Sequence, residues 1–223
     1  MRKIVFLALV LGVSISLKAQ YYEEDVKEAT FPKFSAKVLP TGLMGHFPTY
    51  SISLEHSVLK SMAIEYRLGL VYDGNYLTND YTYFFNKGGV KSSVMFQLPI
   101  KKGERIVNYF GVEPFFNSLN FDRRRTFEIG CGVNCSYFSE VTYGVSRQDL
   151  GVRVSYGTLF YLSEVVFLEF SAGVGAQVSK FSPDNRKPQD ILVEYGDGQY
   201  AEDERRSSPA VDATIKIGFV ILK

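Results

Sequence analysis

The sequence is poor in the residues that carry most catalytic and metal chemistry. Its 223 residues include two histidines, two cysteines and no tryptophan. It has no glycine-rich phosphate loop, no metal-ligand cluster and no nucleophile elbow. The acidic residues of segment 190–206 lack the spacing of a calcium-binding loop. We therefore predict no enzymatic activity, no cofactor and no metal site.

Two further absences narrow the class of protein. After the first twenty residues no apolar run reaches about 18 residues, so we expect no membrane-spanning helix. The 25 Lys and Arg residues nearly balance the 24 Asp and Glu residues, so the basic surface that nucleic-acid binding requires is not expected. No repeat of fixed period and no sustained helical spacing of apolar residues occur.

The first twenty residues, MRKIVFLALVLGVSISLKAQ, have the layout of a secretory signal peptide. Basic Arg2 and Lys3 precede an uncharged apolar run, and the segment closes near Ala19. We predict a signal peptide over 1–19 and a periplasmic N-terminal segment over 20–33. Loss of residues 1–19 removes three basic residues, which leaves a mature net charge near −2.

The two cysteines lie close together in the motif CGVNC. Cys131 and Cys135 belong to a chain that is expected to be exported, so we predict a local disulfide between them. A metal site would need two more ligands, and no histidine lies nearby in the sequence. Because the enclosed loop is short, this disulfide should contribute only modestly to stability.

Alternation of apolar and polar residues recurs along the chain, which is rich in tyrosine and phenylalanine. In segment 165–180, for example, large apolar residues from Val166 to Val178 occupy every second position. None of the clearest apolar faces carries a charge. Eight such segments are found, at 34–40, 48–56, 61–73, 90–100, 106–118, 149–161, 165–180 and 210–222.

The connections between these segments alternate in length. Short links occur at 58–60, 101–105 and 162–164, whereas 74–89, 119–147 and 181–208 are long and 41–47 is intermediate. Short turns on one side and longer loops on the other, with an even number of strands, are typical of outer-membrane barrels. Both termini would then lie on the periplasmic side.

The polar face combines glycine and serine with charges of both signs, which suits a narrow interior. Five basic and six acidic residues fall on it: Lys37, Arg67, Lys91, Arg153, Lys216, Glu55, Glu65, Glu113, Asp149, Glu169 and Asp212. Unpaired ions away from bulk water are costly, so these charges should pair. Six of them lie at similar heights and predict one ion-pair layer in the lumen: Arg67, Lys91, Glu113, Arg153, Glu169 and Lys216.

Two stretches carry a resemblance to a known family. YSISLEHSVLKSMAIEYRLGLVYD (50–73) resembles the first tight hairpin of small outer-membrane barrels of the OmpA/OmpX-like membrane-domain type, and VDATIKIGFVILK (211–223) is similar to their closing strand. The resemblance implies an all-β fold, an eight-stranded antiparallel up-and-down transmembrane β-barrel over 34–222. Ile64, Val154, Phe170 and Ile217 would then face lipid.

The resemblance also implies a location and partners. The chain would lie in the outer membrane of a Gram-negative-type envelope, among outer-membrane lipid and lipopolysaccharide, after insertion by the barrel-assembly machinery. We expect a non-enzymatic structural or surface-interaction role, through extracellular loops that bind an unidentified surface ligand, and a filled lumen. Arg123, Arg124 and Arg125 could contact lipopolysaccharide phosphates, because guanidinium matches phosphate geometry; a plain solvated charge run is the other interpretation.

Two other function classes stay open. A lipid-modifying outer-membrane enzyme would need His46 or His56, which lie at opposite ends of the expected barrel. A soluble lipocalin-like barrel with an apolar ligand cavity would show the same alternation with inside and outside exchanged.

Overall fold

The structure is a computed structural model that describes residues 31–43, 47–59, 62–73, 84–129, 137–184 and 205–222. The predicted signal peptide, most of the N-terminal segment, His46, Cys131 and Cys135 lie outside these residues. The predicted disulfide is therefore one of the expectations that fall outside the described chain.

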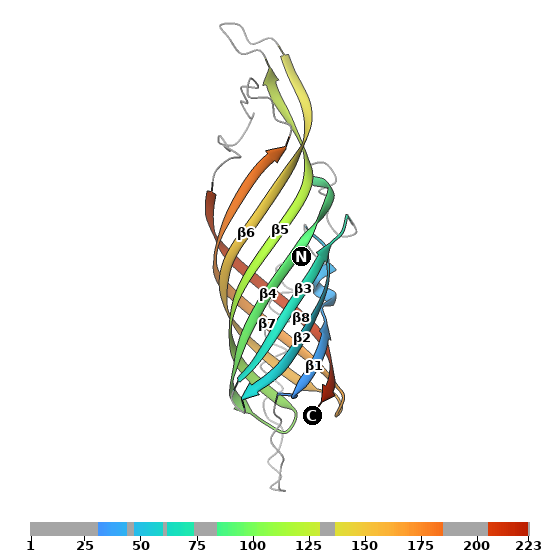
Figure 1. The fold of residues 1–223 in the computed structure, drawn as a ribbon, viewed down its shortest axis with the longest axis vertical. Coiled ribbons are helices and arrows are strands. Elements are labelled where there is room, and N and C mark those ends of the chain that lie inside the picture. Colours follow the sequence, from blue (N-terminus) through green and yellow to red (C-terminus); the bar gives the residue numbers. More distant parts are fainter. Residues whose placement is uncertain are drawn as a thin grey trace, which may run out of the picture.

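The described chain is all-β, and eight antiparallel strands close into one hydrogen-bonded ring (Figure 1). Each strand pairs with the next along the chain, and β8 pairs with β1. This confirms the predicted all-β fold of eight antiparallel strands. The strands are β1 (Phe34–Val38), β2 (Thr49–Leu59), β3 (Met62–Val71), β4 (Phe84–Lys102), β5 (Ile106–Ile129), β6 (Tyr137–Tyr161), β7 (Val166–Asp184) and β8 (Arg205–Leu222).

The long connection expected over 119–147 is wrong in most of its length. β5 and β6 stay paired from Leu119 with Arg147 to Ile129 with Tyr137, so this region is a tall hairpin that rises above the rest of the ring (Figure 1). The strands β4, β7 and β8 also extend beyond the expected segments. Alternation of large apolar residues ends before these strands end, which is why the sequence pattern did not reveal their upper parts.

The two faces of the ring have opposite chemistry. On β3, for example, Tyr66 and Leu68 are exposed on the outside, while Glu65 is buried inside. The outward positions of β6 from Leu150 to Phe160, and of β7 from Val166 to Val178, carry no Asp, Glu, Lys or Arg. Most large apolar side chains of the strands are thus outside and most charged side chains of the strands are inside, the reverse of a water-soluble protein core.

The ring is uneven because β1 is much shorter than its neighbours. β1 pairs with β8 only over Ile217–Leu222 and with β2 only from Ile52 onward. Above β1, the short 3-10 helix η1 (Pro40–Leu43) lies between β2 and β8. Among the described residues no helix is long and apolar enough to cross a membrane.

Candidate functional site

The lumen of the ring is filled at its lower end, where the short turns lie. Phe31 enters from the N-terminal segment and its ring centroid lies 6.0 Å from that of Tyr109. It belongs to a buried apolar layer with Ala63, Met95, Val107, Tyr109, Leu159 and Phe167. Backbone and side-chain hydrogen bonds from Ser57 to the carbonyls of Lys33 and Pro32 fix the entering segment at 3.1 and 2.9 Å. This layer closes the base of the lumen.

Two of the glycines on the inner faces make room for aromatic rings of this layer. A Cβ on Gly157 would lie 2.2 Å from the ring of Tyr109, and one on Gly218 would lie 2.1 Å from the ring of Phe167. The close approach of ring to backbone requires glycine at both positions. These two inner glycines thus accommodate aromatic rings.

Above the apolar layer lies a group of buried charges, which we call the lower ion cluster: Lys37, Glu55, Glu65, Glu169 and Lys216. The ammonium of Lys37 contacts carboxylates of Glu55 at 2.5 Å and Glu65 at 2.9 Å, and also that of Glu169. Lys216 Nζ lies 2.7 Å from both Glu65 and Glu169. All five side chains are at most 1 % exposed.

Neutral donors add hydrogen bonds to the lower ion cluster. The hydroxyl of Tyr109 donates to Glu169, and the Nε2 amide of Gln97 donates to Glu65 at 3.0 Å. One carboxylate oxygen each from Glu55, Glu65 and Glu169 lie within 4.8 Å of one another, a spacing that could hold a metal ion. The ammonium of Lys37 already contacts all three carboxylates.

A second group lies one level higher, which we call the upper ion cluster: Arg67, Glu113, Arg153 and Asp212. Both guanidiniums contact Glu113 Oε1, at 3.3 Å from Arg67 and 3.2 Å from Arg153. Both also approach Asp212, at 3.6 and 3.5 Å. Glu113 is fully buried, whereas the two arginines are 12 and 13 % exposed. The arginines therefore cover Glu113 and present cationic surface toward the space above.

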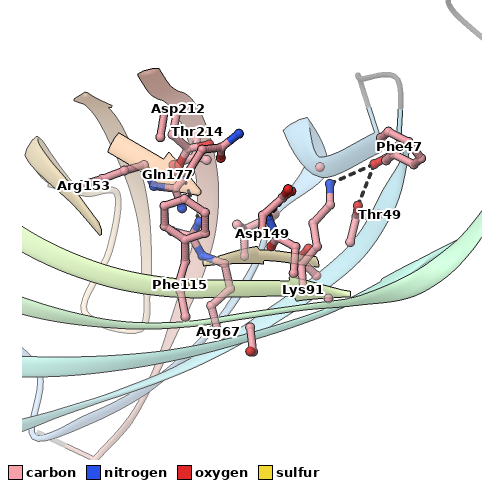
Figure 2. A pocket seen from close by; sticks show the side chains of 18 of the residues that line it. Phe47, Thr49, Arg67, Lys91, Phe115, Asp149, Arg153, Gln177, Asp212 and Thr214 are labelled. Carbon is pink, nitrogen blue, oxygen red and sulfur yellow. Dashed lines mark hydrogen bonds and ion pairs between the residues drawn. The ribbon is translucent and has the colours of Figure 1, made fainter. Parts of the chain in front are cut away.

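The structure spreads the six residues of the expected single layer over several levels, and an ion pair of 3.7 Å between Arg67 Nη2 and Glu65 Oε1 joins the upper ion cluster to the lower one. Glu169 and Lys216 belong to the lower ion cluster, and Arg67, Glu113 and Arg153 to the upper one. Lys91 lies higher still, and its Nζ donates to the carbonyl of Phe47 at 3.0 Å (Figure 2). Height estimated from strand position did not resolve these levels, because strand tilt and register set the height of each residue in a ring.

Sequence reasoning placed Lys37, Glu55 and Glu65 in the interior but left them out of the expected layer. Alternation along each strand had assigned these three residues to the inner face, as it had the six residues of the expected layer. What was missing was the register of β1 against β2 and β8, which brings Lys37 opposite Ser53 and Gly218. At this level Lys37 extends across the lumen to Glu169.

A cavity of about 450 Å³ occupies the lumen above the upper ion cluster (Figure 2). Its charged lining residues are Arg67, Lys91, Arg147, Arg153, Asp149 and Asp212. Arg147 Nε pairs with Asp149 at 2.7 Å, and Phe115 lies against Arg153, with 4.4 Å from the guanidinium to the ring centroid. Counting Glu113 behind the arginines, four cations meet three carboxylates around this space.

Among the described residues, the wall of the cavity is incomplete beside β8. The lining includes every residue from Pro209 to Thr214, the outward-facing as well as the inward-facing ones. A cavity meets both faces of a strand only where it reaches the edge of that strand. A separate apolar groove of about 460 Å³ lies on the outer face, where η1 meets β2 and β3. Leu39 and Ser51 line both spaces, and the Leu39 N–H donates to the Ser51 carbonyl at 3.1 Å.

The predicted phosphate-contact arginines lie on β5, well above this cavity. The Arg123 guanidinium lies 5.8 Å from the ring centroid of Phe84, and that of Arg124 lies 5.2 Å from that of Phe85. Arg124 Nε also lies 4.0 Å from a carboxylate oxygen of Glu140. The backbone of Arg125 continues β5, and its side chain lies outside the described residues.

His56 lies on the outer face near the lower end. Its ring stacks on that of Tyr66, with centroids 5.7 Å apart and an interplanar angle of 5°. This contact gives the ring a packing role on the outer surface.

Neither a family model, nor a curated protein, nor a solved structure matches the chain.

Proposed function

We propose that this protein is an integral outer-membrane β-barrel with a closed lumen, and that its role is structural or interactive at the cell surface. The single observation that carries the proposal is the outer belt of apolar side chains. Thirty-three large apolar side chains of the described residues are exposed, among them Leu150 at 66 % and Val174 at 66 %. A monomeric soluble protein rarely exposes so large a contiguous apolar surface.

The limits of the belt fit the thickness of a bilayer. On β6 the apolar outward positions run from Phe160 to Leu150 and end at Gln148, whose partner on β7 is the exposed Lys180. Such a run has about the 9–11 residues that a tilted strand needs to cross the hydrocarbon region. The lower limit falls at the turns that contain Lys101, Glu104 and Arg105.

The closed ring leaves few strand edges that lipid could contact, which is the condition for crossing a membrane with strands. The buried lower ion cluster and the apolar layer beneath it leave no room for an aqueous channel at the base of the lumen, in the part of the chain that is described. We therefore expect no conductance. The soluble lipocalin alternative would require the apolar belt to face water.

The test is fractionation of cells that express the full chain, followed by electrophoresis of boiled and unboiled samples. We expect the protein in the outer-membrane fraction, extracted only by detergent, with faster migration before boiling because an intact barrel runs compactly. Recovery in the soluble periplasmic fraction without detergent would contradict the proposal and favour a soluble barrel.

A further inference from the structure

The edge of β8 above β1 has backbone groups that the ring does not pair. Ile215 shows which side they face: its N–H donates to Thr41 Oγ1 at 3.1 Å, and its carbonyl accepts from the same hydroxyl at 3.4 Å. Backbone groups of alternate residues face the same side of a strand. No register shift interrupts the pairing of β8 with β7. The N–H and C=O groups of Val211 and Ala213 therefore face the gap between β8 and η1.

Pro209 agrees with this assignment. It has the same parity as Ile215, so its nitrogen faces the gap, where a missing N–H breaks no ladder bond. Within the described residues, no backbone partner is recorded for Val211 or Ala213 on that side. The gap lies level with the upper ion cluster, because Asp212 contacts both arginines.

This position is unusual for a barrel in a membrane. Val211 is 74 % exposed and its partner on β7, Val174, is 66 % exposed, so the gap opens within the apolar belt. Unpaired backbone groups are tolerated at membrane depth only where protein covers them or where they line a polar cavity. The cavity above the upper ion cluster satisfies this condition because Pro209–Thr214 line it.

We propose that this lateral opening admits a long-chain carboxylate from the bilayer, with its headgroup in the cavity and its chain across the edge of β8. The inference rests on the proposed membrane location. Arg67, Arg153 and Lys91 present cations to the cavity, and Glu113 is buried behind the arginines. Asp212 and Asp149 also line it and pair with arginines, so Lys91, whose Nζ contacts a backbone carbonyl, is the cation that an added carboxylate would meet. The N–H groups of Val211 and Ala213 at the opening add donors for the same headgroup.

The apolar part of the ligand has a surface that begins where the cavity ends. Outside the opening, the edge of β8 presents the exposed apolar side chains of Val211, Ala213 and Ile215. A molecule with one anionic end and one alkyl chain matches this sequence of polar and apolar surface. A small inorganic anion would use only the first half of it.

The absence of native tryptophan makes the opening directly measurable. A Val211→Trp variant places a single fluorophore at the opening, and Val174→Trp places one on the neighbouring strand with similar exposure. Both are refolded in detergent micelles and titrated with 9,10-dibromostearate, whose bromines quench tryptophan. We expect saturable quenching at position 211, and at position 174 only the weak linear quenching that micelle partitioning produces.

The headgroup is tested in the Val211→Trp background. Lys91→Gln should weaken binding about tenfold, since a charge-assisted contact is lost, and Lys91→Arg should restore it. The methyl ester of the brominated probe should bind at least tenfold more weakly than the acid. Equal curves at 211 and 174, equal binding of acid and ester, or no effect of Lys91→Gln in a variant that refolds would each overturn the proposal.

Two further measurements distinguish a lipid carboxylate from a free anion, and failure of the binding site from failure of the membrane proposal. Millimolar acetate and inorganic phosphate should fail to displace the probe, and displacement by either would show a free-anion site without a lipid chain. Saturable quenching of a protein recovered without detergent would overturn the membrane proposal while leaving the binding site in place. Absence of saturable quenching in a detergent-dependent, heat-modifiable protein would overturn the binding site alone.

Discussion

At the scale of single residues, glycine makes room for aromatic rings that cross the lumen. Gly157 lies beneath Tyr109, and Tyr109 in turn donates its hydroxyl to Glu169 of the lower ion cluster. Because Gly157 has no side chain, the ring of Tyr109 can lie where its hydroxyl reaches the buried carboxylate of Glu169. An overpacked ring would disturb both the apolar layer and the ion cluster.

Gly157→Ala should therefore lower the free energy of unfolding by about 1–3 kcal/mol, the usual cost of inserting a methyl group into a packed interior. The measurement is urea unfolding in detergent micelles. Gly103→Ala is the matched control, since a Cβ there meets nothing closer than 3.8 Å. Equal midpoints for the two variants would show that Tyr109 moves aside at little cost.

Lys37 is the residue on which the lower ion cluster depends most, because three buried carboxylates contact its ammonium. Lys37→Met should lower the free energy of unfolding by about 3–5 kcal/mol, as expected when one partner of a buried ion group is removed. Lys180→Met, on the exposed outer surface, should change it by less than about 0.5 kcal/mol. Adding Glu55→Gln to Lys37→Met should recover part of the loss, and no recovery would argue against charge as the cause.

At the scale of elements, β8 shows how one strand can be a central strand below and an edge strand above. Its lower part pairs with both β1 and β7, whereas above Ile217 it pairs with β7 alone. The proline at position 209 and the hydroxyl of Thr41 at Ile215 both belong to this change. Apolar alternation continues through both parts, so the pattern does not separate them.

Proline substitution distinguishes a backbone N–H that forms a ladder hydrogen bond from one that does not. Ala213 and Ala172 face each other on β8 and β7, and both are exposed on the outside. Ala172→Pro removes an N–H that faces Tyr156 on β6, so we expect a loss of about 1–3 kcal/mol in unfolding free energy. Ala213→Pro should cost at least threefold less. Urea unfolding checks this, and a larger loss for Ala213→Pro would place its N–H in a ladder bond.

In β8 the apolar alternation continues beyond the point where pairing with β1 ends. In the tall hairpin of β5 and β6, pairing continues beyond the point where the apolar alternation ends. Above Ser118 and Gln148 the outward residues are Asn120, Asp122 and Ser146, which do not form an apolar face. Pairing continues there because backbone hydrogen bonds and cross-strand contacts do not require lipid outside. A pattern search based on apolar alternation therefore ends where the belt ends and not where the strands end.

At the scale of the whole molecule, the distribution of polarity is inverted, with charge inside and apolar surface outside. In the proposed membrane location, a charged side chain on the belt should cost free energy, whereas one beyond the belt should cost little. Val154 lies in the middle of the apolar run of β6, and Gln148 lies just above that run on the same strand and face.

Val154→Arg should lower the free energy of unfolding in lipid bilayers by about 2–4 kcal/mol, the cost of a basic side chain near the bilayer midplane. Gln148→Arg should be close to neutral. Reversible unfolding in lipid vesicles measures both. If the two variants unfold at the same urea concentration, the belt does not face hydrocarbon.

The sequence by itself determined the period-two pattern, the number of strands, their antiparallel order and the residues whose parity turns them inward. These features are local, because alternation along one strand assigns its faces whatever the neighbouring strands do. Only the tertiary structure decided that Lys37 reaches Glu169, that Glu113 lies behind Arg67 and Arg153, and that the wall opens beside Val211. These depend on the register between strands and on the short length of β1, and a strand's own residues do not encode the height at which its neighbour meets it.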